Sequence, residues 1–348
     1  MISAKRTFGF FAGAAIAVAT AAIAAPPAEK GGGKGGSGDP PAAFEPAIGY
    51  KFSGRNYTDI RLANRAGDQA CTVLRLPDGS PSLRGFVFDG ANGRLAYGLE
   101  GDVIYLATLT YEASNPSCPV ALAKNTVAIT PLTVADPETL DFSPRGDHLV
   151  WSEPNKAYTG YGSAFDIVVF DIGAGEHTRI PLEKWGTTNP DWGVTNEWVA
   201  TSTRFSPDFD NSGEIIFSGA PLSGVLGAYN SLFAVNVDGQ TEPRLIVNGA
   251  SMQVDAIVTV TSPGGSGAHK VAFTDNNTGK VRQHRISDGG LVASFSGDEP
   301  AYSCDNSELI HSAKGKGGKP SIYITAADGS SSETWSSGGP RFFDWFCD

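Results

Sequence analysis

Two segments of the chain repeat one pattern, and this repeat restricts the folds that the sequence can adopt. Residues 140–151 and 203–217 each contain a short run that ends in Phe-Ser-Pro, then a turn with glycine, then a run of the form aliphatic-x-aromatic. A third β-branched or aromatic run, a glycine turn and a fourth short run follow each segment. Short apolar runs separated by turn residues are typical of β-strands. The pattern therefore predicts a repeated antiparallel unit of four strands.

Fainter copies of this unit fill the rest of the chain from residue 47 onward. The second strand of each copy has one landmark residue, and these residues are Tyr50, Tyr97, Trp151, Phe217, Phe273 and His311. No stretch has a sustained helical period, so we expect an all-β fold. Six landmarks predict six units.

The two outermost copies are incomplete in complementary ways. The first copy begins at its second strand, residues 48–52, whereas residues 342–345 have the pattern of a first strand with nothing after it. A closed ring can take the strands of one blade from both ends of the repeat, which avoids exposed sheet edges. We therefore predict a six-bladed β-propeller of four-stranded antiparallel blades, closed by the C-terminal strand pairing in the first blade.

The repeat also carries a family resemblance. The run aromatic-Ser-Pro-Asp/Arg-Gly-x-aliphatic-x-aromatic, followed by Ile-x-x-x-Asp/Asn and a glycine turn, resembles the TolB-type propeller repeat. The resemblance covers the predicted propeller and is close in the units around Phe142 and Phe205. It implies the fold rather than a function, because these motifs shape turns and pack blades. TolB itself has a separate α/β domain before its propeller, and this chain has a linker there, so roles tied to that domain are not implied.

Residues 1–24 have the features of a secretory signal peptide. Lys5 and Arg6 precede an uncharged, alanine-rich run over residues 8–22, and Ala22-Ile23-Ala24 has the small-x-small pattern that signal peptidase recognises. The alternative is a retained membrane anchor, but the run is short and weakly hydrophobic for a span. We expect cleavage after Ala24, a location in the periplasm or outside the cell, and no membrane span after cleavage.

Residues 25–46 are rich in glycine and proline and predict a disordered linker before a propeller over residues 47–348. The chain has 26 Lys and Arg against 37 Asp and Glu, a net charge of −11. This acidic excess, without a basic cluster in the folded part, argues against nucleic acid and anionic lipid as partners. We expect a monomer.

The four cysteines are even in number, and an exported chain allows them to form disulfides. Cys304 and Cys347 follow the predicted first strands of two blades that are neighbours across the ring closure. Cys71 and Cys118 fall at the turns between strands three and four of the first two blades. Of the three pairings that four cysteines allow, this register favours Cys71–Cys118 and Cys304–Cys347.

Three long insertions on neighbouring blades are predicted to leave the same face of the ring. Loops on a rigid scaffold concentrate binding residues, and aromatic side chains dominate binding hot spots and sugar-stacking platforms. The candidate binding residues in these loops are Tyr158, Tyr161, Trp185, Asp191, Trp192, Trp198 and Tyr229. The alternative is that the rings only pack the loops against the blades.

The residues Asp208, Asp210 and Ser212 space oxygen atoms as a calcium-binding loop does. The closing glutamate is missing, since Gly219 occupies the twelfth position, and a solvated turn is the favoured interpretation. Calcium is therefore the one cofactor for which the sequence offers a candidate site.

Catalytic motifs are scarce. The sequence has no Gly-x-Ser-x-Gly, His-Glu-x-x-His or paired Cys-x-x-Cys, and its five histidines are scattered. This favours a non-enzymatic binding or scaffold module for a protein or glycan of the cell envelope. The alternative is a polysaccharide lyase or glycoside hydrolase with carboxylates in the central channel, because a propeller assembles such a site from separate blades. A third interpretation is a structural surface protein without a small ligand.

Overall fold

The computed structural model describes residues 44–347, apart from 101–102, 112–117, 119, 132–135, 155–164, 183–187, 190–193, 196–197, 222–230, 250–253, 263–267, 316–319 and 338–340. All described residues belong to one unit, Ala43–Asp348. The predicted signal peptide and almost all of the predicted linker lie outside the described residues. No helix in the described part of the chain has the length and hydropathy needed to cross a membrane.

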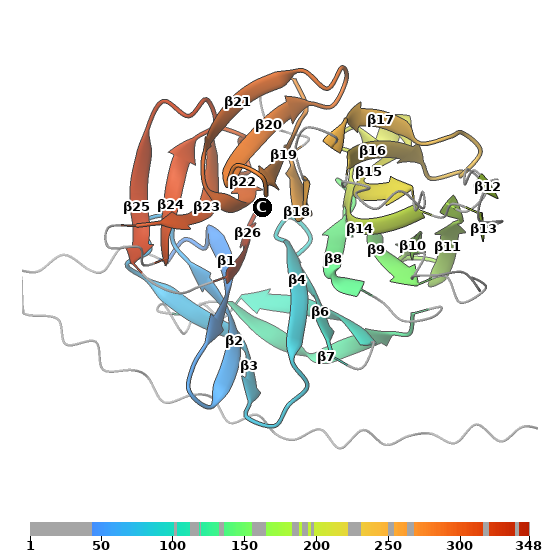
Figure 1. Ribbon diagram of the computed structural model, residues 1–348. Helices are drawn as coiled ribbons and strands as arrows, with labels where there is room; N and C mark the ends of the chain where they lie inside the picture. Colours follow the sequence, from blue (N-terminus) through green and yellow to red (C-terminus); the bar gives the residue numbers. More distant parts are fainter. Residues whose placement is uncertain are drawn as a thin grey trace, which may run out of the picture. The chain divides into compact units, whose positions relative to one another are not determined.

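The described strands form six four-stranded antiparallel sheets arranged as a ring of blades (Figure 1). Blade 1 contains β26 (Arg341–Trp345), β1 (Ile48–Ser53), β2 (Tyr57–Ala63) and β3 (Ala70–Pro77); blade 2 contains β4 (Leu83–Asp89), β5 (Arg94–Leu99), β6 (Val103–Tyr111) and β7 (Val120–Ile129); blade 3 contains β8 (Asp136–Phe142), β9 (His148–Pro154), β10 (Phe165–Asp171) and β11 (Glu176–Ile180). Blade 4 contains β14 (Trp198–Phe205), β15 (Glu214–Pro221), β16 (Ser231–Asn236) and β17 (Arg244–Val247); blade 5 contains β18 (Val254–Val260), β19 (Lys270–Asp275), β20 (Lys280–Arg285) and β21 (Leu291–Ser296); blade 6 contains β22 (Asp298–Tyr302), β23 (Glu308–Lys314), β24 (Pro320–Ala326) and β25 (Ser332–Ser337).

Two further elements interrupt this pattern. A short hairpin of β12 (Thr188–Asn189) and β13 (Val194–Thr195) lies between blades 3 and 4 in the sequence, and a single helical turn, α1 (Phe209–Ser212), follows β14. Each predicted landmark lies in the second strand of its blade. The predicted fold class, six blades of four strands, is therefore confirmed.

The ring closes through blade 1, as predicted. Strand β26 pairs with β1 in antiparallel register, with Ile48 opposite Trp345 and Gly49 opposite Asp344. Gly49 is required here because a Cβ atom at this position would overlap the ring of Phe88 on the next blade. Gly49 on β1 thus allows blade 1 to pack closely against blade 2 next to the closing strand.

The hydrophobic core lies between the blades. Buried apolar residues of the described chain form six clusters, and each cluster joins two neighbouring blades. Trp151 on β9, for example, is fully buried and lies in one cluster with Val87 and Ile104 of blade 2. Burial of one large apolar side chain contributes about 1.5–3 kcal/mol, so the ring is stabilised mainly by contacts between blades.

The serine of the repeat shapes the turn after the first strand. The Oγ atom of Ser143 donates to Oδ1 of Asp147 at 2.7 Å and accepts from the backbone N–H of His148 at 3.0 Å. Ser303 in blade 6 makes two corresponding bonds, to Oδ1 of Asp305 at 2.7 Å and from the N–H of Glu308 at 2.9 Å. The motif on which the family resemblance depends is therefore structural.

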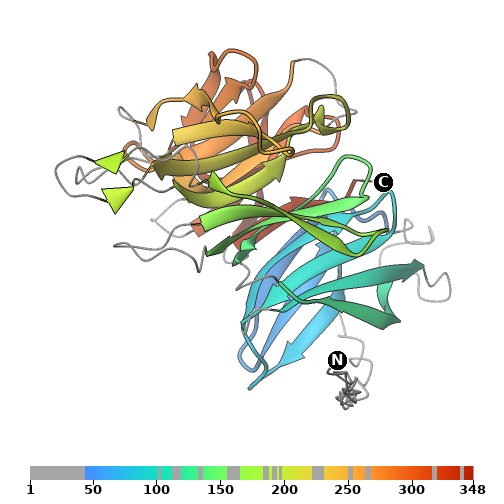
Figure 2. The ribbon, with the colours of Figure 1, turned by 90° about the vertical axis from the view of Figure 1, so that its right-hand side faces the viewer.

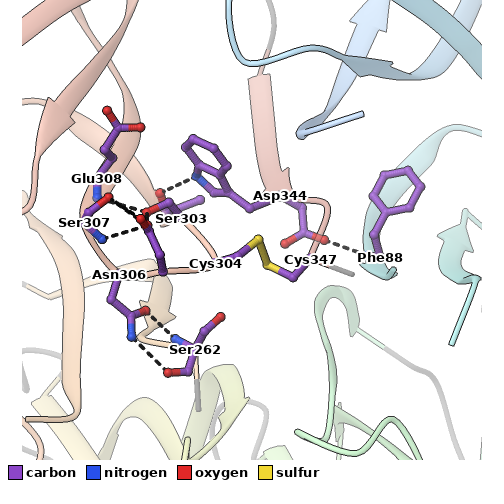
Figure 3. The surroundings of a disulfide bond; sticks show 12 residues. Phe88, Ser262, Ser303, Cys304, Asn306, Ser307, Glu308, Asp344 and Cys347 are labelled. Atoms are coloured by element: carbon purple, nitrogen blue, oxygen red, sulfur yellow. Dashed lines mark hydrogen bonds between the residues drawn. A yellow bond between two sulfur atoms is a disulfide. The ribbon is translucent and has the colours of Figure 1, made fainter. Parts of the chain in front are cut away.

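Two disulfides connect neighbouring blades, with the pairing expected from the sequence. Cys71–Cys118 joins blades 1 and 2, with Cα atoms 5.0 Å apart. Cys304–Cys347 joins the ends of β22 and β26 across the ring closure, with Cα atoms 5.4 Å apart (Figure 3). Both bonds fit a protein that folds in an oxidising compartment.

Candidate functional site

The ring has two different faces. The turns between strands one and two of each blade lie on one face, and the loops between strands two and three lie on the other, together with the connections between blades. In Figure 2 the hairpin β12–β13, part of one such connection, lies on the left, and the end of β26 lies on the right. The central cavity described below opens on the face that carries the turns between strands one and two.

Of the predicted aromatic loops, the structure describes mainly the flanking strands. Tyr158, Tyr161, Trp185, Asp191, Trp192 and Tyr229 lie outside the described residues. The backbone of Trp198 begins β14, opposite Pro221 at the end of β15. On the neighbouring blade, Pro154 ends β9 opposite Phe165 at the start of β10. The strands that carry the three loops thus belong to blades 3 and 4, and the role of the aromatic residues stays a prediction.

The candidate calcium loop is a helical turn. The Oδ1 atom of Asp208 accepts from the side-chain N–H of Asn211 at 2.6 Å, and Oγ of Ser212 donates to the carbonyl oxygen of Asp208 at 2.9 Å. Asp210 forms an ion pair with Arg145 of the neighbouring blade at 2.9 Å. Nowhere in the described part of the chain do three or more His, Cys, Asp or Glu side chains gather as metal ligands. Calcium binding stays a prediction.

A cavity opens at the centre of the other face. Its volume is about 350 Å³, which is within the range of small-ligand pockets. Its walls come from the last residues of the first strands of all six blades, β26, β4, β8, β14, β18 and β22, and from the turns after them. The disulfide Cys304–Cys347 contributes to the wall as well (Figure 3). No single blade could form this site.

Equivalent positions of the six first strands line the cavity. The residues at this position, two before the residue that opens the turn after the first strand, are Asp344, Val87, Asp141, Arg204, Thr259 and Ala301. Three of the six are charged, Thr259 is polar, and Val87 and Ala301 are apolar. The cavity therefore has a polar group of two carboxylates and one guanidinium set among short uncharged side chains.

Both carboxylates are held by the backbone of the next blade. The Oδ2 atom of Asp344 on β26 accepts from the N–H of Phe88 on β4 at 2.6 Å (Figure 3). The Oδ2 atom of Asp141 on β8 accepts from the N–H of Phe205 on β14 at 2.8 Å. Hydrogen bonds to an ionised acceptor are stronger than neutral ones, so the two side chains are fixed in the cavity wall.

Other buried carboxylates of the blades are paired with arginine. Asp59 contacts Arg75 at 2.8 Å, Glu153 contacts Arg179 at 2.9 Å, and Asp275 contacts Arg282 at 2.7 Å. Such pairing offsets the cost of burying a charge. It occurs within single blades, and Asp89, which also lines the cavity, is paired in the same way with Arg94.

Asp141 and Asp344 differ from this pattern. Within the described residues neither forms a salt bridge, although the charge of Arg204 acts on both. The Nη1 atom of Arg204 instead donates to the carbonyl oxygens of Thr203 at 2.8 Å and Leu140 at 3.2 Å. The cavity thus contains two carboxylates that accept hydrogen bonds from the backbone and that form no ion pair with a described side chain.

The pKa values reflect these surroundings. The pKa of Asp344 is raised to about 7, mainly by burial and also by the nearby charge of Asp141, against the effect of the Phe88 N–H and Arg204. Burial also raises the pKa of Asp141 to about 6, opposed by Arg204. Because the two groups interact, they titrate as a pair near neutral pH.

Asp141, Arg204 and Asp344 were not predicted from the sequence. The repeats indicated a channel site only in general terms, as an assembly from separate blades. A signal was present nonetheless, because Asp141 and Arg204 stand directly before the aromatic residue of the two best repeats, and Asp344 stands before Trp345. When the repeats are aligned on their first strands, the three charged residues fall at equivalent positions.

No family model and no curated protein matches the chain. Among solved structures, TolB from Acinetobacter baumannii is 18% identical, with 88% of this chain and 68% of that chain covered and a TM-score of 0.51. A chain of a nidogen/laminin complex is 12% identical, with 86% and 98% covered and a TM-score of 0.56. An oligogalacturonate lyase in complex with manganese is 12% identical, with 80% and 71% covered and a TM-score of 0.52. These likenesses show the fold alone, a TolB-like propeller, and they confirm the resemblance found in the repeat.

Proposed function

We propose that this chain is an exported, non-enzymatic binding module that recognises a protein of the cell envelope through the mouth of its central channel. The observation that carries the proposal is the pair Asp141 and Asp344, two carboxylates that face a cavity and have no salt bridge within the described residues. The signal-peptide features of residues 1–24 and the two disulfides support a place in the periplasm or outside the cell.

The rigidity of the cavity supports a recognition role. Its walls are first strands held at the centre of a closed ring, and hydrogen bonds across blades fix both carboxylates. A site that is already ordered loses little conformational entropy when a partner binds. The aromatic loops on the opposite face are a second proposed contact surface, for the same partner or for a glycan.

An enzyme acting on a polysaccharide is the second candidate, because the channel does contain two carboxylates. Glycoside hydrolysis by such a pair needs one ionised and one protonated carboxyl group. In glycoside hydrolases the two carboxyl groups therefore have different surroundings, which separate their pKa values. Here both pKa values are raised, and both side chains accept a backbone N–H in the same way. This similarity favours recognition over catalysis.

Affinity capture from the native envelope tests the proposal. We expect the immobilised full chain to retain a defined protein, and the double variant Asp141→Asn with Asp344→Asn to lose it. The matched control is Asp78→Asn, which removes an exposed carboxylate on the turn after β3. Capture that survives in the double variant would show that the channel mouth is not the site. Release of sugar products by the wild type, abolished by Asp141→Asn, would establish the enzyme instead.

A further inference from the structure

The cavity has features of a receptor for one kind of charged group. We propose that it binds a primary ammonium group of the partner, held between the carboxylates of Asp141 and Asp344. This inference rests on the proposed function and names the chemistry of the group that enters the cavity. It follows from three properties of the site: the unused acceptor capacity of the carboxylates, the local charge, and the apolar walls.

The carboxylates have acceptor capacity to spare. An ionised carboxylate offers about four lone-pair sites over its two oxygens. The backbone donors of Phe88 and Phe205 each use an Oδ2 atom of one carboxylate. An ammonium group has three N–H donors and no acceptor, so it can bridge carboxylates that come from two different blades.

The local charge favours a cation. With both carboxylates ionised, the group of Asp141, Asp344 and Arg204 has a formal charge of −1. Arg204 directs Nη1 to the carbonyl oxygens of Thr203 and Leu140, and within the described residues it forms no salt bridge with either carboxylate. A bound ammonium would bring the group to neutrality and would supply the direct ion pair that the other buried carboxylates obtain from arginine.

The apolar walls suit the chain that carries an ammonium group. Val87 and Ala301 lie at the same level of the ring as the charged residues, and Val260, one residue further along its strand, also lines the cavity. A methylene stem can pack on such short side chains while its charged end reaches the carboxylates. A lysine side chain and the free amino terminus of a polypeptide both present a primary ammonium on an aliphatic stem, and the experiment distinguishes these two sources.

Titration calorimetry with small probes at pH 7 tests the inference on the full chain. Nα-acetyl-lysinamide presents a side-chain amine only, norleucinamide presents an α-amine only, and Nα-acetyl-norleucinamide presents neither. We expect at least one of the two amines to bind and the acetylated norleucinamide to give no heat of binding. The amine that binds more tightly identifies the source. Equal binding of all three probes would overturn the inference.

Variants and buffers provide a second readout. The double variant Asp141→Asn with Asp344→Asn should weaken amine binding by more than about tenfold, whereas Asp78→Asn should leave it unchanged. Asparagine keeps an acceptor for the backbone N–H groups, and a melting curve checks that the variant is folded. Because binding ionises the pair, the wild type should release protons at pH 6, seen as different heats in two buffers of unlike ionisation enthalpy.

The two proposals fail in different ways. If the amines do not bind but partner capture still depends on Asp141 and Asp344, the ammonium chemistry is wrong and the recognition site stands. If the amines bind and capture does not depend on these residues, the cavity chemistry stands and the proposed function is wrong.

Discussion

The carboxylate of Asp344 accepts a hydrogen bond from the backbone N–H of Phe88, a residue 256 positions earlier in the chain. Asp141 and Phe205, 64 positions apart, repeat this relationship two blades further round the ring. Each carboxylate therefore has two properties that mutation can separate. As a hydrogen-bond acceptor it links two blades. As a buried charge it lowers the stability of the folded state.

Removal of the charge alone should stabilise the protein at high pH. In the folded state the pKa values of Asp344 and Asp141 are raised from 3.8 to about 7 and about 6. Between pH 3.8 and these raised pKa values, the folded state therefore binds more protons than the unfolded state. Stability from these groups is therefore present at low pH and is lost as pH rises, by at most about 1.4 kcal/mol per pH unit for each carboxyl. The double Asn variant should match the wild type near pH 4 and exceed it at pH 8 by several kcal/mol in urea unfolding. A constant difference across this range would contradict the assigned titration.

Removal of the acceptor should have the opposite effect. Asp344→Ala leaves the Phe88 N–H without its partner at the closure of the ring. A buried donor that loses its acceptor costs about 1–3 kcal/mol, so this variant should unfold at lower denaturant concentration than Asp344→Asn at every pH. Equal midpoints for the Ala and Asn variants would show that the hydrogen bond does not link the blades.

The two disulfides should differ in their effect on the cavity. Replacement of either cysteine pair by serine should lower the free energy of unfolding by about 2–4 kcal/mol. Only Cys304–Cys347 holds the strand that carries Asp344. Loss of this bond should therefore also weaken binding of the amine probe, whereas loss of Cys71–Cys118 should not. Calorimetry on both double variants, at a temperature where both remain folded, makes the comparison.

His311 should make the propeller sensitive to acid. Its ring packs between Phe295 and Tyr323, its Nε2 atom lies 2.7 Å from Oγ1 of Thr325, and burial lowers its pKa below the ordinary value of 6.5. The unfolded chain therefore binds a proton more readily, and stability is lost as pH falls through 6.5. His311→Gln should lower stability at pH 7.5 but flatten its decline towards pH 5. A decline as steep as that of the wild type would assign the acid sensitivity to other groups.

The aromatic loops require a test of their own. Replacement of Trp192 and Tyr161 by alanine should reduce partner capture while leaving the melting temperature nearly unchanged, because loop residues at a binding surface contribute to affinity more than to stability. A large fall in melting temperature would instead support the interpretation in which these rings pack the loops against the blades.

The sequence was informative about features that repeat locally. Landmarks such as Trp151 and Phe217 recur within a regular unit, so the number of blades and the closing strand could be predicted, and the cysteine pairs followed from the strand register. The helical turn α1 was not predicted, because four residues are too few to show a helical period. The channel site was not predicted because Asp141, Arg204 and Asp344 are brought together only when the ring is closed.

The pairing of β26 with β1 also determines the order in which the molecule can assemble. As the chain is made from its N-terminal side, β1 forms with β2 and β3 while its other edge remains open, and β26 reaches that edge only after five further blades. Contacts between such distant segments form slowly. During this interval the open edge can accept a strand from another copy, so the rate of closure competes with strand exchange between molecules. The Cys304–Cys347 bond then links blade 6 covalently to the closing strand, so the ring reopens less readily once it has closed.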